Sequence, residues 1–160
     1  MVGLDEIPLS QFVPRCHFAV VLDTYLAGEA RELTVKQQLE HQRVEWVSLC
    51  KMRKHEHGML GWLPSDLLYW IFLKKSDSLA EWMKSIGHEL AHTIEGPETF
   101  HPFELKLPDG CSTYATLEKL CEQFATRWLE LPSVQASKWE VLSELAMNGK
   151  IRLAIPPLTT

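Results

Sequence analysis

A helical hydrophobic period from Leu79 to Ile94 restricts the fold of this chain more than any other feature. Its apolar residues recur three and four positions apart and lie on one broad side of a helix: Leu79, Trp82, Met83, Ile86, Leu90, Ala91 and Ile94. Gly96 and Pro97 follow, and such a pair is typical of a helix end. We therefore expect a helix from Leu79 to Gly96 with one side buried in a core.

This helix carries two histidines and a glutamate in the stretch "HELAH". Residues four apart project from the same face of a helix, so His88 and His92 can present ring nitrogens to one metal ion. Neutral imidazole is a strong ligand of Zn²⁺. Glu89 can then accept the proton of a zinc-activated water, as hydrolysis requires. The pattern predicts a zinc site with Glu89 as general base, and the alternative is a surface helix with incidental histidines.

A catalytic zinc ion normally takes three protein ligands, so one more has to come from elsewhere. In the extended metzincin pattern, a glycine lies three residues after the second histidine and the third ligand lies three residues further on. Here Glu95 occupies the glycine position and Glu98 the ligand position, while Gly96 comes one place late. This route therefore lacks its turn residue.

The other route takes the third ligand from a later helix, which we expect from Thr113 to about Leu131. Glu118 and Glu122 lie one turn apart on one face of that helix, and either can reach the ion. Spacing alone does not rank the two carboxylates. The one that does not bind the metal can instead orient a ligand histidine.

The stretch "LEKLCEQFATRWLELP" resembles the second motif of the ImmA/IrrE family of small metallopeptidases. The matching positions are a glutamate, a small residue, an acidic residue, a Phe-Ala pair and a Leu-Pro helix end: Glu118, Cys121, Glu122, Phe124-Ala125 and Leu131-Pro132. Cys121 stands where alanine is usual, and the Leu-Pro end comes one residue late. The stretch "LLYWIFLKKSDSLAEWMKSIGHELAH" is similar to the strand, turn and helix that lead into the HExxH motif of this family.

The resemblance covers residues 65–132 and implies Zn²⁺ held by His88, His92 and Glu118, with Glu89 as base. It implies an α+β fold of the minimal zincin-like kind, with a small β-sheet packed on the HExxH helix and on a second, ligand-bearing helix. We expect residues 1–160 to form a single domain, with the strand 67–75 at the edge of its sheet. The implied substrate is an intracellular protein or peptide, such as a regulator. The alternative function is a zinc-binding regulatory module that keeps this fold and hydrolyses little.

A peptidase site also needs a donor that stabilises the developing oxyanion. Tyr114, near the start of the Glu118 helix, and His101, in the segment after the zinc helix, are the candidates. An ordinary surface or core role is the alternative for both.

The rest of the chain gives weaker signals. Residues 17–28 are apolar and fit a helix or a strand, whereas Thr34 is a plausible N-cap for a long helix to about Lys54. The glycines and the proline of "HGMLGWLPSD" indicate turns. A last helix is expected from Ser133 to about Met147. We interpret the six tryptophans as packing residues.

Composition narrows the partners and the compartment. The net charge is −5, and neither a basic stripe nor a helix-turn-helix segment is visible, so we expect no nucleic-acid partner. The longest apolar run, Phe18 to Leu22, is too short to cross a bilayer. The first residues lack the basic and apolar regions of a secretory signal, and the cysteines show no paired spacing. We therefore expect a cytoplasmic protein with reduced thiols and no membrane partner.

Overall fold

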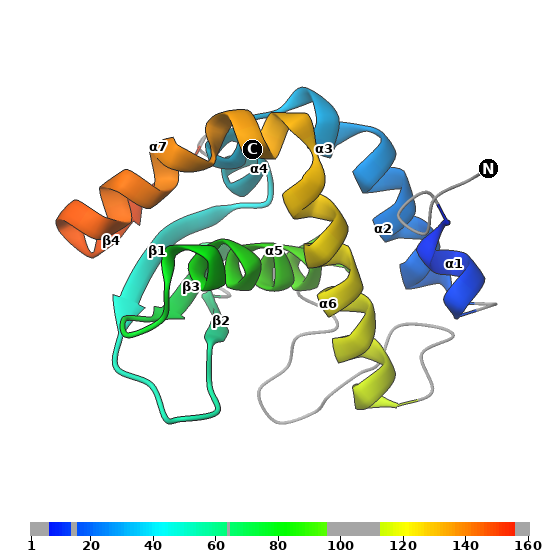
Figure 1. Cartoon of the computed structure of the whole chain (residues 1–160), viewed down its shortest axis with the longest axis horizontal. Helices are drawn as coiled ribbons and strands as arrows, with labels where there is room; N and C mark the ends of the chain where they lie inside the picture. The colour runs from blue at the N-terminus through cyan, green and yellow to red at the C-terminus, as the bar shows by residue number, and fades with distance from the viewer. Residues whose placement is uncertain (1–6, 14–15, 64, 96–112, 156–160) are drawn as a thin grey trace.

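The structure is a computed structural model that describes residues 7–13, 16–63, 65–95 and 113–155. These residues form an α+β fold (Figure 1). The helices are α1 Leu9–Phe12, α2 His17–Ala27, α3 Glu29–Glu32, α4 Val35–His41, α5 Leu79–Glu95, α6 Tyr114–Glu130 and α7 Pro132–Asn148. The strands are β1 Val44–Cys50, β2 Gly58–Leu63, β3 Leu68–Lys74 and β4 Lys150–Arg152.

The strands form one mixed sheet in the order β2-β3-β1-β4. β3 pairs in parallel with β1 and antiparallel with β2, and β4 pairs antiparallel with β1. The expected strand at 67–75 is present as β3, but its predicted place at the edge is wrong. β3 lies inside the sheet, as suits its nearly continuous apolar run, and β2 and β4 form the edges.

The prediction of one long helix from Thr34 to Lys54 is half wrong. Thr34 does cap α4, because its hydroxyl accepts the Gln37 amide at 3.1 Å and the Gln37 side chain accepts the Thr34 amide at 2.9 Å. The helix ends at His41, and Arg43 takes a positive φ of 60°. The next residues become β1, because their β-branched and aromatic side chains find a partner in β3.

The prediction of turns in "HGMLGWLPSD" is wrong for its glycines, because residues 58–63 form β2, but it is confirmed at the end of the stretch, where Ser65 and Asp66 lie in a turn. The glycines that indicated a turn serve close packing instead. A Cβ atom on Gly58 would lie 3.3 Å from the Ser85 Cβ and 3.5 Å from the Glu89 side chain. A Cβ atom on Gly61 would lie 3.4 Å from the Phe72 ring. The missing side chains therefore let β2 lie close to α5 on one face of the sheet and to an aromatic ring on the other.

The later helices agree with the sequence predictions. Ser78 and Glu81 form a capping box at the start of α5, with distances of 3.0 and 3.2 Å between side chain and amide. α6 begins after Thr113, whose hydroxyl accepts the Thr116 amide, and α7 ends at Gly149, where φ is 75°. Residues 17–27, which fitted either a helix or a strand, form α2.

The helix α5 is central to the core (Figure 1). It contacts β2 and β3 of the sheet as well as α2, α6 and α7. Its buried residues Ile86, Leu90 and Ala91 are fully enclosed, as its hydrophobic period predicts. The elements that carry the predicted metal ligands, α5 and α6, therefore lie against each other inside the fold.

The described helices are all too short or too polar to cross a membrane. The tryptophans are only partly the packing residues that the sequence indicated. Trp82 and Trp128 are buried and Trp46, Trp62 and Trp70 are half-buried, but Trp139 is 58% exposed.

Candidate metal centre

The first part of the site lies on successive turns of α5. His88 and His92 lie on the side of the helix that faces α6, and their ring centres are 5.1 Å apart. Both side chains are largely buried, with 12% and 16% of their surface exposed. The apolar residues between them, Leu90 and Ala91, point into the core and fix the rotation of the helix. The spacing of four residues thus brings two imidazoles to one place.

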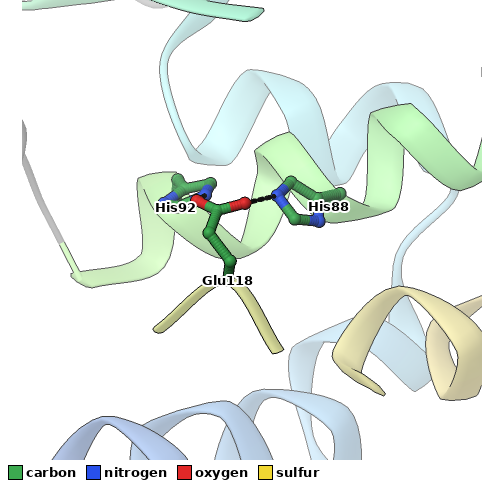
Figure 2. A group of neighbouring side chains, drawn as sticks. All are labelled: His88, His92 and Glu118. Atoms are coloured by element: carbon green, nitrogen blue, oxygen red, sulfur yellow. Dashed lines mark hydrogen bonds and ion pairs between the residues drawn. The ribbon is translucent and has the colours of Figure 1, made fainter. Parts of the chain in front are cut away.

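Glu118 of α6 completes a group of three candidate ligands (Figure 2). Its Oε2 atom lies 2.8 Å from Nε2 of His88, and its Oε1 atom lies 3.1 Å from Nε2 of His92. One donor atom from each residue lies within 4.8 Å of the other two. A tetrahedral ion with ligands at about 2.0–2.2 Å needs donor atoms roughly 3.3–3.6 Å apart. The two imidazole nitrogens and the carboxylate therefore fit Zn²⁺ after small side-chain movements.

The charges at this group favour a cation. Burial alone would raise the pKa of Glu118, but hydrogen bonds from His88 and His92 and their charges outweigh burial and lower it well below 4.5. Burial alone would lower the pKa of His88, but the hydrogen bond to Glu118 and the nearby carboxylates raise it above 6.5. Positive charge is therefore stabilised between these side chains, whether protons or a metal ion supply it.

Glu122, the other candidate for third ligand, lies on the outer side of His88. Its Oε1 atom is 3.0 Å from Nδ1 of His88, and its Oε2 atom is 3.3 Å from the Lys84 ammonium. The buried Nδ1 atom has no well-aligned hydrogen bond, so this contact is an ion pair by distance only. In this arrangement Glu118 lies close to the Nε2 atoms of both histidines. Glu122 instead lies close to Nδ1 of His88, the ring nitrogen that remains free when Nε2 binds a metal ion.

Glu89 lies next to the ligand group and is only 7% exposed. Its side chain packs beside Gly58 of β2. Burial raises the pKa of Glu89, the charges of the two histidines offset part of that effect, and the charges of Glu118 and Glu122 add to it. A raised pKa brings this carboxylate closer to neutral pH, where a general base and acid works best.

The site opens into a cavity of about 810 Å³ between α5, α6 and β2. Tyr114, at the start of α6, lines this cavity and is 51% exposed. Burial, the charge of Glu118 and a hydrogen bond with Glu118 raise the pKa of Tyr114 to about 12. The phenol therefore stays protonated at neutral pH and can donate a hydrogen bond. The other candidate donor, His101, lies outside the described residues.

Gly87 is a residue of the site that sequence reasoning missed. A Cβ atom at this position would lie 2.8 Å from the Trp128 ring and 3.2 Å from the Ala125 Cβ. The glycine therefore sets how closely α5 and α6 approach, and hence how far Glu118 is from the histidines. A signal was present in the sequence. Glycine inside a helix costs about 1 kcal/mol relative to alanine, so a glycine in this position indicates close packing.

A second group of histidine and carboxylates lies at the other end of α5. Nδ1 of His57 is 2.9 Å from Oδ2 of Asp77, and Glu81 lies close to both. Glu81 already accepts the Ser78 amide, and the hydrogen bonds to Ser78 lower its pKa. Because the same carboxylate caps the positive end of a helix, we interpret this group as a structural anchor of the loop before β2.

Comparisons of the chain with models of protein families, with curated proteins and with solved structures found no significant match. The function of the site therefore has to be inferred from its own geometry.

Proposed function

We propose that the protein is a zinc-dependent metallopeptidase. One observation carries this proposal: the Nε2 atoms of His88 and His92 converge on the carboxylate of Glu118, directly beside the buried carboxylate of Glu89. Two imidazoles and one carboxylate are a typical ligand set for a hydrolytic zinc ion. Within this proposal the fold is zincin-like, and the chain is a divergent relative of the ImmA/IrrE family.

The chemistry that Zn²⁺ supplies at such a site is Lewis acidity, which makes a water molecule acidic near neutral pH and polarises a carbonyl group. Glu89 accepts the proton of the attacking water on its carboxylate and then returns it to the leaving amine. Its burial and raised pKa suit both transfers. Tyr114 donates its phenolic hydrogen to the oxygen of the scissile carbonyl, where negative charge develops.

The substrate is a peptide in an extended conformation. The edge strand β2 lines the same cavity through Gly58, Met59 and Leu60, and the outer side of β2 carries no strand among the described residues. An extended chain can pair with such an edge through its main chain. A chain paired in this way would bring a peptide bond to the ligand group, and for this reason we favour a peptidase over a hydrolase of small molecules.

The proposal is tested by metal content together with a cleavage assay on a library of random decapeptides read by mass spectrometry. The wild type should bind one zinc ion at the ligand group and cleave a subset of peptides. Glu89→Gln should keep the zinc and lose cleavage by a factor on the order of 10² to 10⁴. Glu56→Gln is the matched control, because this carboxylate lines the same cavity but forms its ion pair with Arg53.

Two outcomes would contradict the proposal. Cleavage by the Glu89→Gln protein at the wild-type rate would remove Glu89 as the base. Zinc bound by His88, His92 and Glu118 without cleavage of any peptide would instead identify the regulatory module that was the alternative from sequence.

A further inference from the structure

The face of the sheet that turns away from α5 carries aromatic and basic side chains. Side chains alternate between the two faces of a strand. The inner set is buried in the core and comprises Val47, Leu60, Ile71, Leu73 and Ile151. Gly58, which shares the inner face with Leu60, lies against α5. The opposite set is half-buried or exposed, and we call it the outer sheet face: Trp46, Ser48, Met59, Trp70, Phe72, Lys74, Lys150 and Arg152.

The strand register arranges these residues in two rows across the sheet. One row runs from Arg152 through Trp46 and Trp70 to Gly61. The next runs from Lys150 through Ser48 and Phe72 to Met59. Each row therefore begins with a cation on β4 and has an aromatic ring on β3, in the middle of the sheet.

The aromatic part of this face forms a platform. The rings of Trp70 and Phe72 are 6.2 Å apart and meet edge to face at 66°. Gly61 lies beside them and has no side chain to cover them, while Met59 continues the apolar surface and is 48% exposed. Such a surface offers aromatic and apolar atoms to a ligand.

The basic part lies at the β4 side of the platform. The Lys150 ammonium and the Arg152 guanidinium each lie 5.6 Å from the centre of the Trp46 ring. Glu45 contributes one carboxylate, which accepts a hydrogen bond from the Trp70 indole at 3.3 Å. This face therefore carries an excess of positive charge although the whole chain has a net charge of −5. The sequence shows no basic run, because Lys150 and Arg152 are separated on β4 by the buried Ile151, and Lys74, the third cation of this face, comes from β3.

We propose that the outer sheet face binds single-stranded nucleic acid. Bases stack on Trp70 and Phe72, and phosphates lie beside Lys150 and Arg152. This pairing of ring faces with cations is how proteins bind single strands without reading their sequence. An acidic peptide would use the cations but gain little from the aromatic rings of Trp70 and Phe72, so the structure favours nucleic acid.

The test is fluorescence anisotropy with a labelled oligothymidine of about 15 nucleotides at low salt. We expect a dissociation constant on the order of 10⁻⁴ to 10⁻⁶ M, and we expect the affinity to fall steeply as salt is added. Replacing Lys150 and Arg152 together by glutamine should weaken binding about tenfold and make the salt dependence shallower, by about 0.7 in slope for each phosphate that the variant no longer neutralises. Trp70→Leu should weaken binding about fivefold or more while leaving the salt dependence unchanged.

The matched control replaces Lys138 by glutamine and Trp139 by alanine. This lysine also lies 5.6 Å from a tryptophan ring, but on α7 and outside the outer sheet face. Its substitution should leave binding unchanged. Glu89→Gln should also leave it unchanged, which separates this inference from the proposed peptidase.

Three results would overturn the inference. One is no binding at low salt. Another is equal weakening in the Lys138 and Trp139 control, and the third is displacement of the oligonucleotide by polyglutamate of the same length as readily as by unlabelled oligothymidine. Circular dichroism of each variant verifies that the fold is retained, as expected for exposed Lys150 and Arg152.

Discussion

At the scale of single residues, the two carboxylates of α6 have different relations to the histidines. Glu118 lies within 3.1 Å of a ring nitrogen of both His88 and His92, whereas Glu122 lies close to the outer nitrogen of His88 alone. The first arrangement suits a metal ligand. The second suits a residue that holds the ring of a ligand histidine in place.

This difference predicts the effect of substitution on zinc affinity. Glu122→Gln should weaken zinc binding by about 10- to 100-fold, because it removes only the orienting interaction. Glu118→Gln should weaken it further, because it removes a ligand. Competition with a chromophoric chelator measures both, and Glu130→Gln at the exposed end of α6 serves as control. A larger effect in Glu122→Gln would reverse the assignment of the two residues.

The charges of the site predict how stability depends on pH in the metal-free protein. The lowered pKa of Glu118 contributes stability above about pH 4.5 that is lost as pH falls through the folded-state pKa. The raised pKa of His88 contributes stability below about pH 6.5 that is lost as pH rises through the folded-state pKa. The interactions of Glu118 and His88 should therefore contribute most to the folding stability of the metal-free protein between about pH 4.5 and 6.5.

Thermal unfolding across pH 4 to 8 measures this effect. The melting temperature of the metal-free protein should fall above pH 6.5, whereas that of the zinc-loaded protein should rise, because bound zinc requires deprotonated histidines. Glu118→Gln should flatten the first profile. If the melting temperature depended on pH in the same way with and without zinc, the prediction that zinc replaces protons on the histidines would be wrong.

At the scale of elements, the contact between α5 and α6 depends on Gly87. Gly87→Ala places a methyl group 2.8 Å from the Trp128 ring, so the helices have to separate. We expect a decrease of about 1–3 kcal/mol in unfolding free energy together with weaker zinc binding, because Glu118 moves away from the histidines. Urea unfolding and chelator competition measure the two effects.

Gly149→Ala is the control for this prediction. Gly149 has a φ of 75° and has no atoms near its missing Cβ, so alanine is strained there but causes no clash. It should cost about 1 kcal/mol without changing zinc affinity. A Gly87→Ala protein with wild-type zinc affinity would show that the helix spacing does not control the site.

The helices α5, α6 and α7 were predictable because their signals are local. Ser78 and Thr113 cap their helices with their own side chains, and Gly149 ends α7 by its backbone conformation. The strands β1 and β2 were not predictable from local signals, since both exist through pairing with β3. Gly58 and Gly61 indicate a turn until the elements packed against them are known. Likewise, spacing on α6 could not rank Glu118 and Glu122, because the choice depends on where α6 crosses α5.

At the scale of the whole molecule, one buried amide joins distant parts of the fold. Oε1 of Gln38 accepts hydrogen bonds from the Tyr25 hydroxyl at 2.9 Å and the Trp128 indole at 2.7 Å. Its Nε2 atom donates to the carbonyl oxygens of Ala30 and Leu33. The helices α2, α4 and α6 are therefore tied to a single side chain that is fully buried.

Gln38→Leu should be among the most destabilising substitutions in the chain. It leaves two buried donors and two carbonyl groups without this partner, at about 1–3 kcal/mol for each unsatisfied group. Urea unfolding should show a decrease of at least about 3 kcal/mol, whereas Gln11→Leu on the exposed side of α1 should change little. A decrease below about 1 kcal/mol would mean that the core rearranges around position 38.

The close approach at Gly87 also has a consequence for recognising related chains. Any protein that builds its site in this way has to keep small residues where the two helices touch, whatever happens to its surface. We expect relatives to carry glycine immediately before the first histidine of HExxH and a small residue seven positions after the glutamate ligand, as Gly87 and Ala125 do here. A search pattern built from these two positions and the three proposed ligands represents the contact between the two helices. Such a pattern can find homologues whose overall sequence identity is low.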